Sequence, residues 1–265
     1  MTLKNFQKSI FLLFISIFFI ACSSKNTPTL TAQKSKVTQT LETDSLEDEF
    51  DNEFAEADKE VFDPLEGYNR FMTSVNDKVY LYAFDPVSKA YAFVIPKPAR
   101  LGVSNVFHNL KFPIRFTNNL LQLKFDASMK ELGRFMINSS IGILGLFDVA
   151  KMAGVEPQEE DFGQTLGYYG VGSGFHVVLP FLGPSNLRDT LGFSVDTAIA
   201  PTTSGSIKYQ IPNNAEKALG LSTAYYVNKN SLHPGEYENL KKDALDVYTF
   251  FRDSYEQQRT KAIEE

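Results

Sequence analysis

Few residues in this 265-residue chain have the types and spacing that covalent chemistry requires. Ser173 lies off the centre of GVGSG, so the Gly-x-Ser-x-Gly elbow that exposes a nucleophilic serine is absent. The glycine-rich run 170–174 has some features of a nucleotide loop, but no Lys-Ser or Lys-Thr pair follows it. His108, His176 and His233 have no Cys or His partner at metal-ligand spacing. The sequence therefore favours a protein that is not an enzyme and needs no metal or cofactor.

The N-terminus carries the one modification that the sequence predicts. Two lysines precede an apolar run, residues 10–20, which is too short to span a membrane but is typical of a secretory signal. The run ends in FIAC, whose Cys22 is the only cysteine. FIAC resembles the bacterial lipobox, with Phe19 at the position of the usual Leu, and this implies removal of residues 1–21 and acylation of Cys22. The alternative is an ordinary signal peptide with an incidental cysteine.

The residue after the cysteine and the acyl chains predict a location. Several acyl chains anchor a protein stably, because each buried CH₂ contributes about 0.8 kcal/mol. Ser23 follows the cysteine, and Asp there would indicate retention in the inner membrane. By analogy, we expect the chain in the outer membrane of a Gram-negative bacterium, anchored from the periplasmic side.

Residues 22–62 have the composition of a solvated tether. Within this segment, residues 42–60 hold ten acidic residues and a single lysine, which predicts disorder. The net charge of the whole chain is −6, and most of it lies in this segment, so residues 61–265 carry only −2. A nearly neutral body offers no basic surface, which excludes a nucleic-acid-binding protein.

Residues 63–265 are long enough for a single domain with a sizeable core, and their apolar spacing predicts a mainly α fold with few or no strands. Asp63, Pro64 and Glu66 are a typical helix start. The patterns predict helices over 63–82, 85–94, 104–110, 117–121, 126–136, 213–226 and 237–255, with a capping box at Asp126 to Glu131. They predict strands over 175–179 and, more weakly, 207–211.

The segment 134–189 has two unlike halves. Residues 135–149 carry no charge until Asp148, and a run of apolar side chains there includes Gly142 and Gly145. The second half places six glycines among aromatic and aliphatic residues. Such a segment can be packed in a soluble core or face lipid, and a lipid-facing one must pair its backbone groups internally, which favours helix.

Four segments resemble the MlaA/VacJ family of outer-membrane lipoproteins, and the resemblance is strongest over residues 63–196. In order, they are DPLEGYNR (63–70), RLGVSNVFHNL (100–110), RFMINSSIGILGLFDVA (134–150) and DFGQTLGYYGVGSGFHVVLPFLGPSNLRD (161–189). The first supplies the family motif residues Asp63, Pro64, Glu66, Asn69 and Arg70.

The resemblance implies a ring-like helical domain embedded in the outer membrane, with an amphipathic channel for phospholipids that have strayed into the outer leaflet. It further implies retrograde transport, in which a soluble, MlaC-like periplasmic carrier receives the lipid, and association with a trimeric porin. This transport would maintain the lipid asymmetry of the outer membrane.

On this basis, the first half of 134–189 is predicted to be a helix or helical hairpin at membrane depth, and the second half a gate or rim. The candidates for lipid-facing or channel positions are Ile141, Gly142, Leu144, Gly145, Phe147, Gly167, Gly170, Gly172 and Gly174. Arg134 and Arg188 are candidates for contact with lipid phosphate.

Two other functions remain open from the residues. One is a structural or adhesion lipoprotein without transport activity, whose unacylated form would ignore liposomes. The other is a lipid hydrolase, which would release fatty acid.

Overall fold

The computed structural model describes residues 63–202, 215–242 and 244–265. They belong to one compact unit, Glu60–Glu265. The signal peptide, Cys22 and the tether lie outside the described residues, so the predicted bounds of those segments stay predictions.

The unit begins with a helical run whose middle is a π-helix. It consists of α3 (Glu66–Val79), η1 (Tyr80–Phe84) and α4 (Asp85–Val94). The amide of Asp85 donates to the carbonyl of Tyr80, five residues earlier, and this bond carries the helix past Pro86. The sequence predicted two helices here, and the structure has both, joined without a loop.

Three further helices follow, and two of them have a proline in the first turn. They are α5 (Lys97–Leu110), α6 (Phe112–Leu121) and α7 (Phe125–Ser140). Pro98 and Pro113 lie in the first turns of α5 and α6, where a missing N–H costs nothing. The expected short helix at 104–110 therefore starts at Lys97. The expected capping box at the start of α7 is wrong, because Ser128 and Glu131 are buried and make other contacts.

The uncharged apolar segment, predicted to be a helix or a helical hairpin, is not one continuous helix. Helix α7 ends at Ser140, and turns follow before the short α8 (Val149–Met152). Ile143, Leu144 and Gly145 all have positive φ angles, of 52°, 58° and 89°. Left-handed residues end a helix, so a single continuous helix through this segment is wrong, and two helices joined by turns are present instead. The membrane depth of the segment stays a prediction. None of the described helices has both the length and the apolar character needed to cross a membrane.

A two-stranded sheet interrupts the helices. Helix α9 (Phe162–Tyr168) leads to β1 (His176–Leu179), which pairs antiparallel with β2 (Gly183–Asn186) before α10 (Leu187–Ile199). The strand predicted over 175–179 is confirmed. The one predicted over 207–211 lies outside the described residues.

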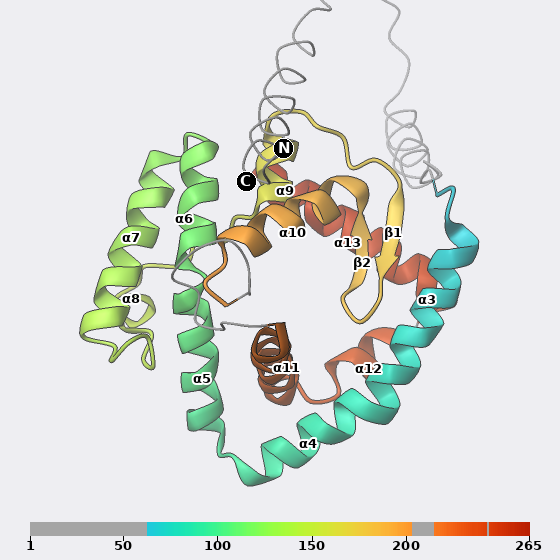
Figure 1. Cartoon of the computed structure of the whole chain (residues 1–265), viewed down its shortest axis with the longest axis horizontal. Helices are drawn as coiled ribbons and strands as arrows, with labels where there is room; N and C mark the ends of the chain where they lie inside the picture. The colour runs from blue at the N-terminus through green and yellow to red at the C-terminus, as the bar shows by residue number, and fades with distance from the viewer. Residues whose placement is uncertain (1–62, 203–214, 243) are drawn as a thin grey trace, which may run out of the picture. The chain divides into compact units, whose positions relative to one another are not determined.

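Three helices complete the chain: α11 (Ala215–Leu232), α12 (Glu236–Lys242) and α13 (Val247–Glu264). The single long helix predicted over 237–255 is wrong, because the structure has two helices there, α12 and α13. The Asp246 side chain accepts hydrogen bonds from the amides of Tyr248 and Thr249 and caps α13. Figure 1 shows the helices of the unit following one another in a ring, with α11 inside it. The prediction of a ring-like, mainly helical domain with few strands is confirmed.

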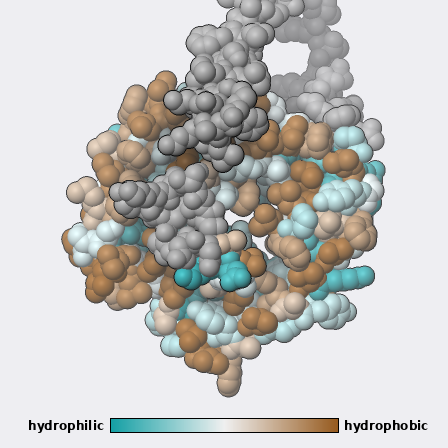
Figure 2. Space-filling view, in the orientation of Figure 1, coloured by the Kyte–Doolittle hydropathy of each residue, from teal (hydrophilic) through white to brown (hydrophobic). Residues whose placement is uncertain are grey.

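Burial in this unit is inverted relative to a water-soluble protein. Among the described residues, buried side chains are mostly polar or charged, whereas many large apolar side chains are exposed. Phe93 is 93% exposed, for example, while Arg134 is 2% exposed. Brown apolar residues are prominent on the outer surface in Figure 2. Buried polar groups must find partners, so the interior is held by hydrogen bonds and ion pairs.

Candidate functional site

The interior of the ring is organised by the start of α9. Asp161 accepts a hydrogen bond from the amide of Gln164 at 2.8 Å, and the Gln164 side chain accepts from the Asp161 amide at 3.1 Å. This is a capping box, formed by an Asp and a Gln three residues apart. It fixes the Asp161 carboxylate at the entry of a short helix, facing α13.

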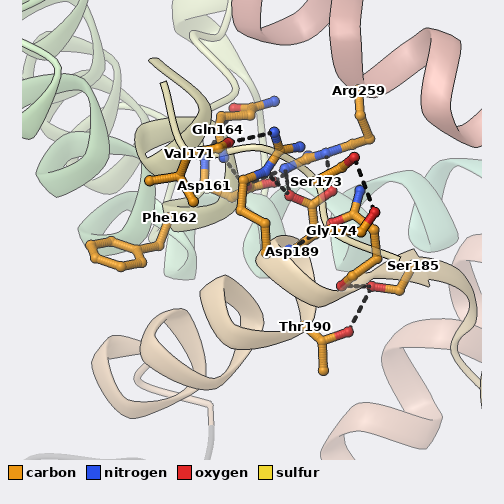
Figure 3. A network of polar contacts seen from close by, with 12 residues as sticks. Asp161, Phe162, Gln164, Val171, Ser173, Gly174, Ser185, Asp189, Thr190 and Arg259 are labelled. Atoms are coloured by element: carbon orange, nitrogen blue, oxygen red, sulfur yellow. Dashed lines mark hydrogen bonds and ion pairs between the residues drawn. The ribbon is translucent and has the colours of Figure 1, made fainter. Parts of the chain in front are cut away.

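Arg259 of α13 joins α9 to α10 through two carboxylates. Its guanidinium donates to both oxygens of Asp161, at 2.6 and 2.8 Å, and to both oxygens of Asp189, at 2.8 and 3.1 Å. Asp189 also accepts from Arg188 at 2.9 Å and from Tyr255 at 2.8 Å. We call Asp161, Arg188, Asp189, Tyr255 and Arg259 the polar hub, most of which Figure 3 shows from close by.

The pKa values in the hub follow from this pairing. Burial opposes the charged forms of Arg259 and Asp189, but their mutual hydrogen bonds and charges outweigh burial. The pKa of Arg259 is therefore raised and that of Asp189 is lowered. Burial, followed by the charge of Asp189, raises the pKa of Tyr255. Arg259, Asp189 and Tyr255 therefore hold their usual charge states at neutral pH, and the hub connects α9, α10 and α13.

Asp196, two turns further along α10, has no cation of its own. Its oxygens accept from Asn118 and from the amide of Phe162, both at 2.9 Å. Burial, opposed by these two hydrogen bonds, raises the pKa of Asp196 to about 6. The site therefore contains one buried carboxylate that is partly protonated near pH 6.

Two adjoining cavities open beside these groups. The first, of about 240 Å³, lies against the polar hub, and the second, of about 360 Å³, lies between α5, α6, α10 and α11. Five residues line both cavities: Asp161, Leu182, Phe193, Asp196 and Tyr226. Figure 2 shows the molecule hollowed at its centre, with polar and apolar residues around the opening. The ring thus encloses a connected space with carboxylates, aromatic rings and aliphatic side chains on its walls.

The structure gives the two predicted phosphate-binding arginines internal partners. Arg134 is 2% exposed, donates to Asp148 at 2.9 Å and contacts the carbonyl of Val155. Arg188 is 7% exposed and donates to Asp189. Neither side chain is among those that line the two central cavities. Their contact with phosphate stays a prediction, and the contacts seen here fasten α7 to α8 and complete the polar hub.

The motif residues near the start of the domain hold it to the sheet and to α13. Asn69 is fully buried, donates to Asp63 and to the carbonyl of His176, and accepts from the amide of Val178. Asp63 also accepts from Tyr248 of α13. Arg70 forms ion pairs with Glu66 at 2.7 Å and with Asp246 at 2.5 Å. Pro64 occupies the turn before α3.

The first group of lipid-facing candidates lies in the turn that follows α7. Ile141, Leu144 and Phe147 are 69%, 76% and 52% exposed. The two glycines permit close packing instead, because a Cβ at Gly142 would meet the carbonyl of Phe147 at 2.2 Å, and one at Gly145 would meet Asn109 at 2.6 Å.

The second group of candidates divides between packing positions and an open loop. A Cβ at Gly167 would meet Ile263 at 2.6 Å, and one at Gly174 would meet Leu187 at 3.0 Å. Gly170 and Gly172 have open space around them, in the loop between α9 and β1. None of the four lines the two central cavities, and gating by this loop stays a prediction.

Sequence reasoning missed Lys111, Asp196 and Arg259, three of the charged residues at the cavities. The pair Asp161 and Gln164 carried a usable signal, since their spacing is that of a capping box. Lys111, Asp196 and Arg259 lie within or next to ordinary helical sequence, so nothing in the local sequence distinguishes them. No group of His, Cys, Asp and Glu within the described ranges has the arrangement of a metal site.

These features define a class: a helical ring whose outer surface is apolar, whose interior is polar and which surrounds a lined central space. A family model described as MlaA lipoprotein matches residues 61–262, and the chain belongs to that family. The resemblance seen in the sequence is therefore confirmed.

Named relatives and a solved structure agree with this assignment. The chain is 43% identical over 138 residues to the intermembrane phospholipid transport system lipoprotein MlaA of Escherichia coli (strain K12), covering 51% of this chain and 55% of the relative. It is 30% identical over 206 residues to the protein of the same name from Haemophilus influenzae, covering 74% and 76% of the two chains. A solved structure described as "Structural basis for maintenance of bacterial outer membrane lipid asymmetry" aligns with a TM-score of 0.65 and 32% identity, over 76% of this chain and 98% of the other.

Proposed function

We propose that this chain is the outer-membrane lipoprotein of an intermembrane phospholipid transport system. It removes phospholipids that have entered the outer leaflet of the outer membrane and passes them through its central space toward the periplasm. A soluble, MlaC-like carrier receives them, a trimeric porin associates with the ring, and the direction of transport is retrograde. The names of the relatives support the transport role.

The observation that carries the proposal is the inverted burial. Exposed residues such as Phe93, Leu144 and Met152 would be costly in water but are stable against acyl chains. Helices α3 and α6 are amphipathic, and none of the described helices is of membrane-spanning type, which suits a ring lying within one side of a bilayer. The central space has walls polar enough for a headgroup and apolar enough for the start of an acyl chain.

Surface labelling of a deletion strain tests the function. Intact cells are treated with an amine-reactive reagent that does not cross the outer membrane, and labelled phosphatidylethanolamine is quantified. Deletion is expected to raise surface phosphatidylethanolamine several-fold and to increase sensitivity to detergent, and the wild-type gene is expected to reverse both.

Unchanged surface lipid together with unchanged detergent resistance would overturn transport and favour a structural or adhesion lipoprotein. Incubating the purified protein with phospholipid and measuring free fatty acid tests the hydrolase alternative, for which we expect no release above a buffer control.

A further inference from the structure

Four charged residues on the wall of the larger central cavity have internal partners. Arg115 pairs with Glu131 at 2.8 Å, and Glu160 pairs with Lys124 at 2.7 Å. The other two are Glu159, paired with His108 at 2.7 Å, and Asp161, paired with Arg259 at 2.6 Å. These groups stabilise the ring and leave little charge for a ligand.

Two charged residues on the same wall have no ion pair in the described part of the chain. Lys111, at the junction of α5 and α6, places its ammonium 4.1 Å from the centre of the Tyr225 ring, and its charge also acts on the Glu159 carboxylate without forming an ion pair with it among the described residues. Asp196, on α10, receives only the amide donors of Asn118 and Phe162. Lys111 and Asp196 do not pair with each other. The cavity therefore has on its wall one cation and one anion, from different parts of the chain, that lack an ion pair within the described residues.

The surroundings of these groups suit a small charged group attached to hydrocarbon. The cavity volume of about 360 Å³ falls in the range of small-molecule sites, roughly 300–1,000 Å³. Apolar and aromatic residues make up much of the remaining wall: Phe107, Ile114, Leu182, Phe193, Leu221 and Tyr226. Aromatic faces also attract ammonium groups.

We propose that this cavity is a subsite for a zwitterionic phospholipid headgroup of the phosphoethanolamine type, with Lys111 binding the phosphate and Asp196 the ammonium. The inference rests on the proposed transport function and adds to it a preference among lipids. An anionic headgroup without an amine, such as phosphatidylglycerol, satisfies Lys111 but leaves Asp196 without a cation. Burying a carboxylate without a counter-charge is unfavourable, and an ammonium relieves that cost.

The test compares two lipids with identical acyl chains on the full-length, acylated protein. The protein is purified in mild detergent at pH 7.5 and incubated with an equimolar mixture of phosphatidylethanolamine and phosphatidylglycerol. The bound lipids are then quantified by mass spectrometry. We expect wild type to prefer phosphatidylethanolamine about tenfold, the effect of one charge-assisted hydrogen bond.

Two substitutions separate the two contacts. Asp196→Asn is expected to bring the lipid ratio close to one by lowering phosphatidylethanolamine alone. Lys111→Gln is expected to lower both lipids several-fold, and Lys111→Arg to restore both. The matched control is Lys130→Gln, which removes a lysine from the exposed surface of α7 and should change neither lipid. Because Lys111 makes only a cation–π contact, its variants test the site even if Asp196→Asn does not fold.

The outcomes distinguish this inference from the function on which it rests. Equal binding of both lipids by wild type, or an unchanged ratio in folded Asp196→Asn, overturns the headgroup preference and leaves transport intact. Binding of neither lipid by wild type, together with unchanged surface phospholipid in the deletion strain, overturns both.

Discussion

Three aspartates near the centre of the ring differ because their partners differ. Asp161 and Asp189 share Arg259. Burial opposes the charge of Asp189, but its hydrogen bonds and the charge of Arg259 lower its pKa. Asp196 has amide donors only, so burial dominates and its pKa is raised to about 6. Asp161 and Asp189 stabilise the ring through their ion pairs with Arg259, whereas ionising Asp196 costs free energy because the carboxyl is buried.

This cost makes the effect of Asp196→Asn on stability depend on pH. A carboxyl whose folded pKa is raised contributes most to stability when protonated, below pH 3.8, and this contribution is lost as pH rises through about 6. The asparagine variant avoids that loss. Relative to wild type, its free energy of unfolding should therefore rise between pH 4 and pH 7.5, by up to about 3 kcal/mol.

Denaturant unfolding of both proteins at several pH values measures this difference. Asparagine supplies one acceptor oxygen where two donors are present, which adds a penalty of about 1–3 kcal/mol that does not depend on pH. The slope with pH is therefore the diagnostic quantity. A difference that stays constant from pH 4 to pH 7.5 would show that Asp196 titrates normally.

Arg259→Met is expected to destabilise the ring by about 3 kcal/mol, since it leaves two aspartates without their shared cation. The matched control is Arg252→Met on the same helix, whose ion pair is with its neighbour Asp253. We expect that control to cost less than about 1 kcal/mol. Thermal unfolding in detergent compares the stability of the two variants. Equal losses of stability would show that the polar hub does not hold the helices together.

At the scale of elements, α9 and α10 approach each other through glycine. A Cβ at Gly192 would lie 2.4 Å from the amide nitrogen of Gly163 and 2.8 Å from its Cα. Both atoms belong to backbone, which cannot turn aside as a side chain can. The close contact therefore requires glycine at position 192. It sets the distance between Asp161, at the start of α9, and Asp189, in the first turn of α10.

Gly192→Ala should separate these helices and cost about 2 kcal/mol or more. Gly220→Ala provides a control within α11, where a Cβ would have nothing within 4 Å. That substitution should stabilise the helix by up to about 1 kcal/mol, because alanine favours helix over glycine. Melting temperatures of the two variants should move in opposite directions, and a neutral Gly192→Ala would contradict the observed packing.

Sequence patterns predicted the elements that depend on local chemistry. The helix that starts at Asp85-Pro86 and the strand 175–179 follow from backbone preferences, and the structure has both. The turn after α7 was not predictable, because Ile143 and Leu144 are apolar residues in a conformation that local preference disfavours. Contacts such as Asn109 against Gly145 hold it, and they join parts of the chain far apart in sequence.

The candidate site was less predictable than the fold for the same reason. Arg134 and Arg188 flank an apolar segment, which suggested a ligand, but their partners Asp148 and Asp189 come within reach only in the folded chain. Lys111 and Asp196 line one cavity although 85 positions separate them in the numbering. Spacing along the sequence does not reveal contacts between residues that are far apart in the chain.

At the scale of the whole unit, the inverted burial predicts membrane binding that does not depend on the anchor. The full chain with Cys22→Ser lacks the acylation site but keeps the exposed apolar side chains. It should float with phospholipid vesicles in a density gradient. A structural lipoprotein with a water-soluble body would remain at the bottom of the gradient.

Charge placed on the apolar exterior should weaken that binding. Phe93 and Met152, 93% and 84% exposed, contact few protein atoms, so Phe93→Glu and Met152→Glu should fold normally in the Cys22→Ser background. Removing a buried Phe from lipid costs about 1.5–3 kcal/mol, and hence about tenfold or more in vesicle affinity. Gln257→Glu adds the same charge at an exposed polar position of α13 and should leave flotation unchanged. If all three variants float as the Cys22→Ser parent does, the apolar exterior around Phe93 and Met152 is not the membrane-binding surface.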